Sequence, residues 1–426
     1  MEKPTKIKKK MSVNNFVLGD NPLDQIEEIY EYRQTIKTPD EYKNFVNEVR
    51  NLVQKMAVEA IKQGPKHCLV AMATGSGKTK VAIDYAKTRD KKQCLLVPTE
   101  KLRDRNWTDE YVTWGAQDLS DNTEKYCYAS AKKVKDKSYS LAILDEGHNI
   151  TEHNSQFFYD NEIDKSVLLT ATVPSAKKDF AKVEVLQAIG YKKVFELTLD
   201  QAVKLGFVAP YEINVIEVPL ESSKKTVVGG TKAKPFMTTE QSTYQWLNTN
   251  LKKSFFSNNI NTALAVNKRM HFIYKLESKR DAAKYFLDNI IPKEDRGLIF
   301  ASSIEQAEYL CEHTFHSKTD DVDYEKFKSG ELDRMSCVKA LNEGHNFNQL
   351  DFGLVTQLTS KEKDLVQRIG RLVRMRPGHK AKIFIFVSIG TQDEKWLESA
   401  TSGLDPGSIS YYPYKNLKNY TFYEKL

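Results

Sequence analysis

The stretch AMATGSGKT at residues 71–79 lies between a short apolar run and a segment whose apolar residues recur with helical spacing. In a glycine-rich turn between a strand and a helix, backbone N–H groups can surround phosphate oxygens. Lys78 can neutralise the β and γ phosphates, and the Thr79 hydroxyl can bind Mg²⁺. Met72 replaces the glycine that begins the strict form of the pattern. The stretch predicts an ATP site with these ligands: Thr74, Gly75, Ser76, Gly77, Lys78 and Thr79.

Short apolar runs rich in β-branched residues recur along the chain and predict buried strands. Helical patterns separate these runs, and this alternation favours parallel sheets covered by helices. The expected strands are residues 67–73, 93–98, 139–145 and 166–172, followed by 297–302, 338–341, 352–356 and 382–387. The sequence therefore predicts an α/β protein with two tandem parallel-sheet domains.

Two carboxylates stand at the end of one of these expected strands. Residues 141–145 read LAILD, and Asp145 is followed by Glu146. Beside a phosphate loop, Asp145 can hold the water shell of Mg²⁺ while Glu146 orients and deprotonates an attacking water. The pair therefore predicts phosphoryl transfer to water.

Arginine is concentrated in one decapeptide, QRIGRLVRMR at residues 367–376. The chain has 13 arginines against 51 lysines, and four of the arginines fall within this stretch. A planar guanidinium binds phosphate oxygens in bidentate fashion, which a lysine ammonium cannot do. This concentration predicts arginines that bind the γ-phosphate and stabilise charge in the transition state.

The three motifs, with DEGH at residues 145–148, resemble those of the superfamily 2 helicases and translocases. The resemblance covers roughly residues 53–387. It implies two tandem RecA-like domains with an ATP cleft between them, ATP and Mg²⁺ as cofactors, and ATP hydrolysis stimulated by nucleic acid. It also implies that Thr79 and Asp145 are the metal-binding residues.

The resemblance assigns further residues to hydrolysis and to nucleotide binding. Arg371 and Arg374 correspond to the arginine fingers, and Gln367 to a residue that senses the γ-phosphate or its water. Gln54 lies where the family often has an adenine-reading glutamine. In VKALNEGHN at residues 338–346, which is similar to the fifth motif, the nucleotide-binding candidates are Gly344 and Asn346. An aspartate is usual at the second of these positions.

Two other groups of residues are carried over from the family. The LLTAT stretch at residues 168–172 resembles a motif that couples hydrolysis to domain movement, and the coupling candidates are His148, Thr170, Thr172 and Arg368. Three further stretches resemble motifs that contact the nucleic-acid backbone, and their candidates are Pro98, Thr99, Arg103, Ser302, Ser303, His316 and Lys318.

The length and net charge of the chain are compatible with a helicase or translocase. The chain has 426 residues and a formal net charge of +7, which permits a polyanionic partner. No apolar run approaches the roughly 20 residues of a membrane span, and no apolar signal core follows the lysine-rich N-terminus. We therefore expect a cytoplasmic protein without contact to a membrane. The five cysteines are widely spaced and are expected to be free thiols.

The expected domain organisation has five parts. Residues 1–50 form an N-terminal basic arm with helices, 51–215 the first RecA-like domain, 216–295 a loop and helical insert, 296–400 the second RecA-like domain, and 401–426 a C-terminal tail. The lysines at the N-terminus suit a solvated tail better than a DNA contact. The aromatic residues of the C-terminal tail are expected to pack onto the second domain.

The insert contains two kinds of sequence. Residues 221–235 (ESSKKTVVGGTKAKP) predict an exposed flexible loop, and 242–290 are expected to be helical. Trp246, Leu247 and Leu251 are predicted to share one side of the first helix. The helices could pack onto the second domain or form a separate subdomain, and the pattern leaves both open.

The finer features favour DNA as the substrate. The TAT motif, the WTDEYVTWG segment and the QRIGRLVR ending are more similar to the DNA-directed branch of the superfamily than to RNA-directed proteins. We expect a helicase or translocase that remodels forked or branched DNA in branch migration, recombination or replication repair. An RNA helicase and a motor subunit of a restriction-type complex are the alternatives. A catalytically silent clamp is disfavoured because the catalytic residues are present, and no nuclease motif is found.

Overall fold

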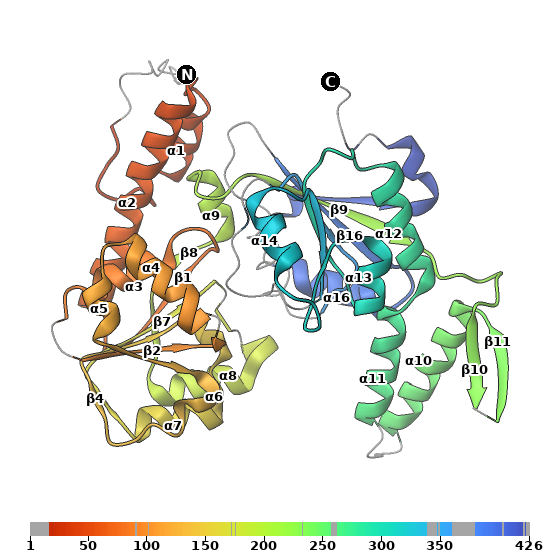
Figure 1. Cartoon of the computed structure of the whole chain (residues 1–426), viewed down its shortest axis with the longest axis horizontal. Coiled ribbons are helices and arrows are strands. Elements are labelled where there is room, and N and C mark those ends of the chain that lie inside the picture. The colour runs from red at the N-terminus through yellow and green to blue at the C-terminus, as the bar shows by residue number, and fades with distance from the viewer. Residues whose placement is uncertain are drawn as a thin grey trace, which may run out of the picture. The chain divides into compact units, whose positions relative to one another are not determined.

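The computed structural model describes all residues except 1–16, 90–91, 101, 172, 175, 232, 257–261, 339–346, 348–349, 360–379, 403, 421 and 423–426. The chain divides into two compact units, Met1–Ala209 and Pro210–Leu426. The sequence predicts the first large domain to end at residue 215, so the unit boundary lies slightly earlier. Each unit contains one large parallel sheet (Figure 1). No helix among the described residues is both long and apolar enough to cross a membrane.

The sheet of the first unit has six parallel strands in the order β3-β2-β5-β7-β1-β8. The strands are β1 His67–Met72, β2 Gln93–Val97, β3 Thr123–Cys127, β5 Leu141–Leu144, β7 Ser166–Thr170 and β8 Lys192–Leu197. A separate pair of short parallel strands consists of β4 Ser138–Tyr139 and β6 Glu162–Ile163. The central strands are apolar and buried along their whole length, as expected for a sheet covered on both faces. The strands predicted at residues 67–73, 93–98 and 166–172 are confirmed, and the one at 139–145 is divided into β4 and β5.

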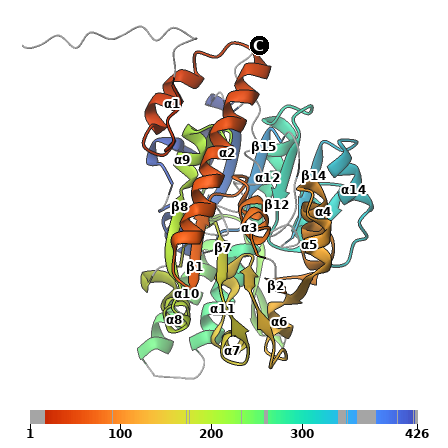
Figure 2. The ribbon, with the colours of Figure 1, turned by 90° about the vertical axis from the view of Figure 1, so that its left-hand side faces the viewer.

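Nine helices of the first unit connect and cover these strands. They are α1 Ile26–Arg33, α2 Pro39–Gln63, α3 Lys78–Ala86, α4 Trp107–Thr113, α5 Gln117–Asp121, α6 Tyr128–Ala131, α7 Glu152–Tyr159, α8 Ala176–Ile189 and α9 Leu199–Lys204, counted over the residues described in this unit. A π-helical turn spans Leu102–Asn106 and a 3₁₀ turn spans Gly147–Asn149. The long α2 begins at Pro39, and the Thr38 hydroxyl accepts a hydrogen bond from the Glu41 N–H at 3.3 Å. It runs along α3, β1 and β8 (Figure 2).

The sheet of the second unit has seven parallel strands in the order β13-β14-β12-β15-β16-β9-β17. They are β9 Tyr211–Val218, β12 Gly297–Phe300, β13 Thr314–Phe315, β14 Arg334–Cys337, β15 Phe352–Val355, β16 Ala381–Ser388 and β17 Ile409–Pro413. The described helices are α10 Glu240–Phe256, α11 Thr262–Tyr274, α12 Glu277–Asn289, α13 Ile304–Leu310, α14 Val322–Ser329 and α16 Gln392–Thr401. Two 3₁₀ turns span Pro406–Ser408 and Tyr414–Asn419.

The core of the second unit is rich in aromatic rings. Phe286 of α12 packs on Phe384 of β16 with ring centroids 4.6 Å apart, and Phe422 lies 5.4 Å from Phe286. The predicted packing of the C-terminal aromatic residues is therefore confirmed for Phe422, which belongs to the buried core. The helix α12 is part of the same core. The preceding helices α10 and α11 pack on each other and also on α16 of the same unit, where the rings of Tyr274 and Trp396 lie 5.5 Å apart. The first of the two expected arrangements, packing of the helices onto the second unit, therefore applies.

Two sequence predictions in this unit are wrong. A third, the strand at residues 338–341, stays a prediction because residues 339–341 lie outside the described part of the chain. The sequence search also missed β14 at Arg334–Cys337, whose arginine and serine hide it from a search for apolar runs. The loop predicted at 221–235 is exposed but contains an antiparallel hairpin, β10 Val227–Thr231 and β11 Lys234–Thr238. Trp246 is 62% exposed, because Tyr244 and Leu251 provide the buried side of α10.

Replacing Lys279 by alanine tests the buried ion pair of the second unit. Lys279 Nζ lies 2.7 Å from Asp393 Oδ2, and both side chains are fully buried. Removing the ammonium leaves a buried carboxylate without its counter-charge, so we expect Lys279→Ala to lower the free energy of unfolding by about 3–5 kcal/mol.

The matched control is Lys284→Ala, which removes a partly exposed lysine of the same helix from its pair with Asp288. It should change the free energy of unfolding by less than about 1 kcal/mol. Urea titration followed by tryptophan fluorescence measures both variants. Equal losses in the two would contradict a special role for the buried pair.

Candidate active site

The predicted hydrolysis residues of the first unit meet at one edge of its sheet. Parallel strands all end at the same edge, which is where α/β proteins bind their ligands. β7 pairs with β1 on one side and with β5 on the other. The phosphate loop follows β1, Asp145 follows β5, and Thr170 ends β7. The topology therefore brings together motifs that are far apart in sequence.

The phosphate loop has the backbone conformation that its glycines allow. Gly75 and Gly77 have φ values of 85° and 92°, in the left-handed region that favours glycine. The Ser76 hydroxyl donates to the Ala73 carbonyl at 2.6 Å, inside the loop. Lys78 begins α3, and its Nζ donates to the Met72 carbonyl at 3.2 Å. The lysine therefore folds back over its own loop, at the N-terminus of a helix suited to bind phosphate.

Gln54 lies against this loop. Its Nε2 donates to the Ser76 carbonyl at 3.1 Å, and its side chain is buried. A Cβ at position 77 would lie 2.2 Å from that same nitrogen, so the close approach of Gln54 requires glycine there. The amide of Gln54 thus supports the loop in this structure, and its predicted contact with adenine stays a prediction.

Among the predicted catalytic residues that the structure describes, Asp145 is the most buried. Trp107 Nε1 donates to its Oδ2 at 2.8 Å, and the Glu146 N–H donates to its Oδ1 at 2.9 Å. The hydroxyl of Tyr128 donates to its backbone carbonyl at 2.9 Å. Burial raises the pKa of Asp145, while the Trp107 hydrogen bond and the positive charge of Lys78 act in the opposite direction. These contacts keep the carboxylate oriented at the end of β5.

The backbone turns sharply after Asp145. Glu146 has a φ of 47°, an uncommon value for a residue with a side chain and one that costs free energy. At Gly147 a Cβ would lie 2.1 Å from Leu168 Cγ of β7, so the turn can pack against the sheet only with glycine there. The Glu146 carboxylate that follows this turn lies 3.4 Å from His148 Nδ1.

His148 joins the carboxylate turn to β7. Its Nδ1 lies 3.4 Å from Glu146 Oε2 and 3.3 Å from Thr170 Oγ1. Lys182 of α8 donates to the His148 carbonyl at 2.6 Å. The structure therefore brings three predicted residues, Glu146, His148 and Thr170, into one contiguous group.

The donor set fits Mg²⁺ bound together with a nucleotide. Both carboxylate oxygens of Asp145 accept one hydrogen bond each and keep lone pairs for a further ligand, and Thr79 lies in the first turn of α3. Among the described residues no cluster of three His, Cys, Asp or Glu could hold a metal. Magnesium is commonly bound by one or two protein ligands plus phosphates and water, so Thr79 and Asp145 would suffice.

The nucleic-acid candidates of the first unit follow β2. Pro98 is half-buried and Thr99 is exposed. The Thr99 carbonyl accepts the Arg103 N–H at 3.1 Å. The Arg103 guanidinium forms two hydrogen bonds to the neighbouring Asp104, at 2.7 and 2.8 Å, which raise the pKa of Arg103. Part of the charge of Arg103 is thus balanced locally.

The candidates of the second unit gather at the corresponding edge of its own sheet. Ser302 and Ser303 follow β12, and the Ser303 hydroxyl caps α13 by accepting the Gln306 N–H at 3.2 Å. The Ser302 hydroxyl donates to the Tyr274 carbonyl at 2.7 Å.

The other two follow β13, the edge strand of that sheet. His316 is buried, and its Nδ1 accepts the backbone N–H of Lys318 at 3.3 Å. The Lys318 side chain is exposed. The hydroxyls of Ser302 and Ser303 and the Nδ1 of His316 therefore have internal partners. The Nε2 of His316 is buried without a hydrogen bond to any described residue, 3.9 Å from Glu308 Oε1, and Lys318 presents a charge to solvent.

Seven predicted residues lie outside the described part of the chain. They are Thr172, Gly344, Asn346, Gln367, Arg368, Arg371 and Arg374. Their roles in nucleotide binding, coupling and transition-state stabilisation stay predictions.

Trp107 and Tyr128 are site residues that the motifs did not indicate. Both contact Asp145 across the fold, from α4 and α6. Trp107 is 1% exposed. The sequence showed only a tryptophan near the start of a helical segment, and nothing in its spacing pointed to a carboxylate 38 residues away.

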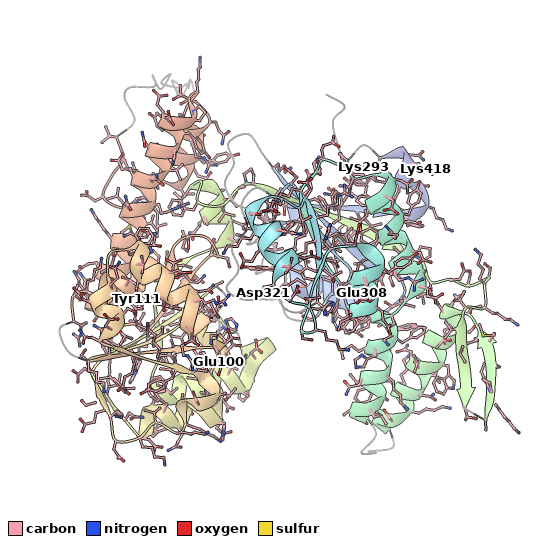
Figure 3. The ribbon with its side chains drawn as sticks, viewed as in Figure 1. Glu100, Tyr111, Lys293, Glu308, Asp321 and Lys418 are labelled. Carbon is pink, nitrogen blue, oxygen red and sulfur yellow. The ribbon has the colours of Figure 1, made fainter. Side chains whose placement is uncertain are left out.

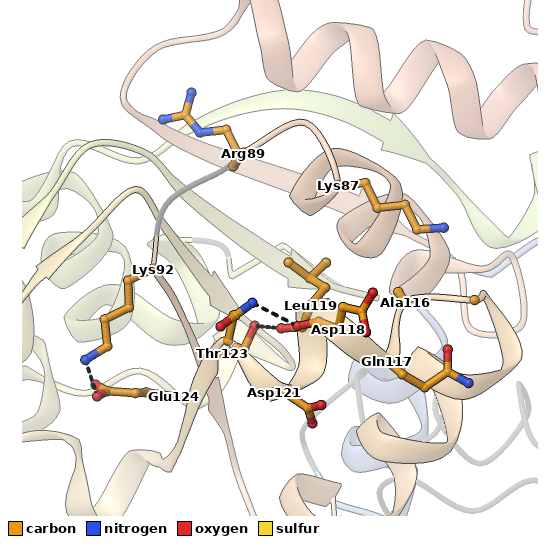
Figure 4. Close-up of a pocket in the computed structure, with 12 residues that line it drawn as sticks. Lys87, Arg89, Lys92, Ala116, Gln117, Asp118, Leu119, Asp121, Thr123 and Glu124 are labelled. Atoms are coloured by element: carbon orange, nitrogen blue, oxygen red, sulfur yellow. Dashed lines mark hydrogen bonds and ion pairs between the residues drawn. The ribbon is translucent and has the colours of Figure 1, made fainter.

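A pocket of 940 Å³ lies elsewhere on the first unit, where β2 and β3 begin (Figure 4). Its basic groups already have partners: Lys92 pairs with Glu124, Lys87 donates to the Trp114 carbonyl at 2.7 Å, and Arg89 donates to the Ser140 carbonyl at 3.0 Å. Parallel strands begin at the edge opposite to the one where they end, so this pocket is not part of the hydrolysis site.

Comparison with known protein families gives two matches. Residues 43–207 match the family described as type III restriction enzyme, res subunit, and residues 279–376 match the helicase conserved C-terminal domain. Together they identify the chain as a helicase or translocase of the superfamily 2 type, whose domains hydrolyse a nucleoside triphosphate. No curated protein matches the chain.

Several solved structures share the fold. A fragment described as the HsdR subunit of a type I restriction enzyme from Vibrio vulnificus YJ016 matches with a TM-score of 0.54 and 15% identity, over 85% of this chain and 68% of that one. A variant of S. cerevisiae Dbp5 bound to RNA and ADP BeF3 matches with a TM-score of 0.53 and 12% identity, over 90% and 95%.

The Pyrococcus furiosus Hef helicase domain matches with a TM-score of 0.45 and 13% identity, over 82% of this chain and 97% of that one. The two family matches and the two structures with TM-scores of 0.54 and 0.53 confirm the prediction of two tandem RecA-like domains.

Replacing Trp107 by phenylalanine tests the support of Asp145. The change removes the indole N–H and keeps a large aromatic ring, and a lost hydrogen bond to a charged group is worth about 1.5–3 kcal/mol. If this support is needed in the transition state, we expect the turnover of ATP to fall by about 10- to 100-fold. The matched control is Trp114→Phe, which removes an indole that donates to the half-buried Glu110 at 2.8 Å. Steady-state phosphate release measures both, and similar turnover in the two variants would contradict the role of Trp107.

Proposed function

We propose that this chain is an ATP-driven DNA helicase or translocase that remodels forked or branched DNA, as in branch migration, recombination or replication repair. The observation that carries the motor activity is the convergence of Lys78, Asp145 and Glu146 at one sheet edge, with His148 linking Glu146 to Thr170. A carboxylate next to a phosphate loop, coupled through a buried histidine to another strand, suits hydrolysis that drives a conformational change.

The chemistry divides among the residues of this edge. Lys78 neutralises negative charge on the β and γ phosphates, and the Glu146 carboxylate, which is only partly buried, accepts a proton from the attacking water. Bound Mg²⁺ would polarise the phosphate oxygens from its position on Thr79 and Asp145. We propose that Arg371 and Arg374 supply the bidentate contacts that stabilise transition-state charge.

The preference for DNA is part of the proposal. The TAT motif, the WTDEYVTWG segment and the QRIGRLVR ending support it. Contacts of such a motor are made mainly to phosphates, so binding should depend on salt and only weakly on sequence. Pro98, Thr99 and Lys318 are the proposed backbone contacts at the ends of their strands.

A motor subunit of a restriction-type complex is the second candidate. The match of residues 43–207 to the res subunit family favours it. In that case a partner chain would supply DNA cleavage or recognition, since this sequence contains no nuclease motif of its own.

Steady-state ATP hydrolysis tests the proposal directly. The purified chain is assayed without polymer and with single-stranded DNA, duplex DNA, a four-way junction or RNA. We expect strong stimulation by duplex or branched DNA and little by RNA. Stimulation by RNA alone would replace the proposal with an RNA helicase, and a flat response to every polymer would favour the motor subunit that needs a partner.

The substitution Glu146→Gln separates hydrolysis from binding. An amide of nearly the same shape cannot accept the proton, so turnover should fall by about 10²–10⁴-fold while nucleic-acid affinity stays within a few-fold of the unsubstituted chain. Glu152→Gln, at an exposed position in the first turn of α7, makes the same chemical change outside the site and should leave turnover unchanged. Normal hydrolysis by the Glu146 variant would refute the assignment of this site.

A further inference from the structure

One segment of the second unit carries a large surplus of positive charge. Residues 222–276, here called the basic insert, contain nine lysines and arginines and one carboxylate, a net charge of +8. The other 371 residues carry 55 basic and 56 acidic side chains, a net charge of −1. The whole positive excess of the protein, +7, therefore comes from about one eighth of its length.

The basic insert forms two hairpins that extend from the second unit. Strands β10 and β11 form an antiparallel ribbon, and α10 and α11 form a helical hairpin beside it (Figure 1). Arg269 of α11 donates to Asn248 of α10 at 2.9 Å and to Gln392 of α16 at 3.1 Å. These bonds to neutral amides hold the helical hairpin on the unit without cancelling the charge of the arginine.

The single carboxylate of the insert is not available to balance the lysines. Glu240 is 1% exposed, and its oxygens accept hydrogen bonds from the Ser278 N–H, the Ser278 hydroxyl and the Glu221 N–H. In contrast, the lysines with a described side chain are all exposed and none forms an ion pair within the described structure: Lys224, Lys225, Lys234, Lys252, Lys253, Lys268 and Lys275. The insert thus presents uncompensated positive charge to solvent.

The ribbon also exposes apolar side chains on both faces. Val228 and Met237 are cross-strand partners, 69% and 50% exposed, and Phe236 is 59% exposed opposite Gly229. A Cβ at Gly229 would lie 2.9 Å from the Phe236 ring, so the ring lies across the backbone of the neighbouring strand. An isolated two-stranded ribbon gains little stability from its own packing. Its exposed aromatic ring and lysines are therefore better explained by contacts with a ligand.

We propose that the basic insert is a second nucleic-acid site, which binds the phosphates of a DNA duplex through its lysines and places Phe236 against the bases at a junction. This inference rests on the proposed function and adds a binding surface outside the family motifs. A two-stranded ribbon fits the major groove of duplex DNA, and exposed apolar side chains can insert at base steps or stack on unpaired bases. Net positive charge with its one carboxylate buried favours a polyanion over a protein partner.

Charge removal tests the phosphate contacts. Binding of a fluorescent forked duplex is measured by anisotropy without nucleotide, over a series of salt concentrations. For Lys225→Ala combined with Lys234→Ala we expect affinity at 100 mM salt to fall at least tenfold, and the slope of log affinity against log salt to decrease by about 2. The control is Lys293→Ala combined with Lys418→Ala, two exposed lysines of the same unit that lie at the end away from the ribbon (Figure 3). It should bind within twofold of the unsubstituted chain.

Substitution of the aromatic ring tests the contact with bases. The forked duplex carries 2-aminopurine at the fork. Phe236 should separate this base from its neighbouring base, and the loss of base stacking should raise the 2-aminopurine fluorescence. Phe236→Ala should abolish most of this rise, while Phe255→Ala, a similarly exposed phenylalanine on α10 at 63%, should retain it. Equal behaviour of the two phenylalanine variants would overturn the role of Phe236.

The binding assay keeps this inference distinct from the proposed function, because it needs no hydrolysis. If the Lys225/Lys234 variant and the Lys293/Lys418 control bind DNA equally well while DNA still stimulates hydrolysis, the insert proposal is overturned and the motor proposal stands. If the Lys225/Lys234 variant binds DNA more weakly than the control but no polymer stimulates hydrolysis, the insert proposal stands and the DNA-motor proposal fails. If the unsubstituted chain binds no nucleic acid, both proposals fail.

Discussion

The buried carboxylate of Asp145 constrains the architecture of the first unit around it. A carboxylate removed from water needs hydrogen bonds and a nearby cation to remain charged. Trp107 and the Glu146 N–H donate to its oxygens, and the charge of Lys78 acts on it through space. Each of these groups comes from a different element, so the positions of α4, of the carboxylate turn and of the phosphate loop all depend on this one group.

The same constraint accounts for the irregular backbone at this edge. The positive φ of Glu146 and the contact of Gly147 with Leu168 are both features that a regular strand end would avoid. They place Asp145 and Glu146, which are adjacent in sequence, in different surroundings: the carboxylate of Asp145 is bound by Trp107, and that of Glu146 is partly exposed beside His148. Strain of this kind is maintained where the surrounding fold overdetermines the conformation.

The second unit also has a buried carboxylate near a strand end, but there a lysine ion pair stabilises it. After β16, Asp393 pairs with Lys279, and the same carboxylate oxygen accepts the Ser388 N–H at 3.1 Å. This buried pair ties α16 to α12 and so to the aromatic core. The basic insert is attached to the same region through Arg269 and Gln392, which places a strongly charged segment on a well-packed support.

Regular features of the fold were predictable from the sequence because they follow local rules. The buried strands at 67–73 and 166–172 are continuous apolar runs, and the glycines of the phosphate loop have the φ values that their pattern implies. Predictions failed where local composition was misleading. The ribbon β10–β11 contains two consecutive glycines, and Trp246 is a large apolar side chain on an exposed helix face.

By itself, the sequence determined the chemical groups of the site and the order of the two α/β domains, because glycine, lysine, carboxylate and arginine motifs carry their chemistry in their residue types. Only the tertiary structure decided which groups meet. Strand order places β7 between β1 and β5 and so joins the phosphate loop, Asp145 and Thr170, and it brings Trp107 to a carboxylate far along the chain. Such contacts depend on strand order and helix packing, which are set by long-range burial of apolar surface, and no local pattern encodes them.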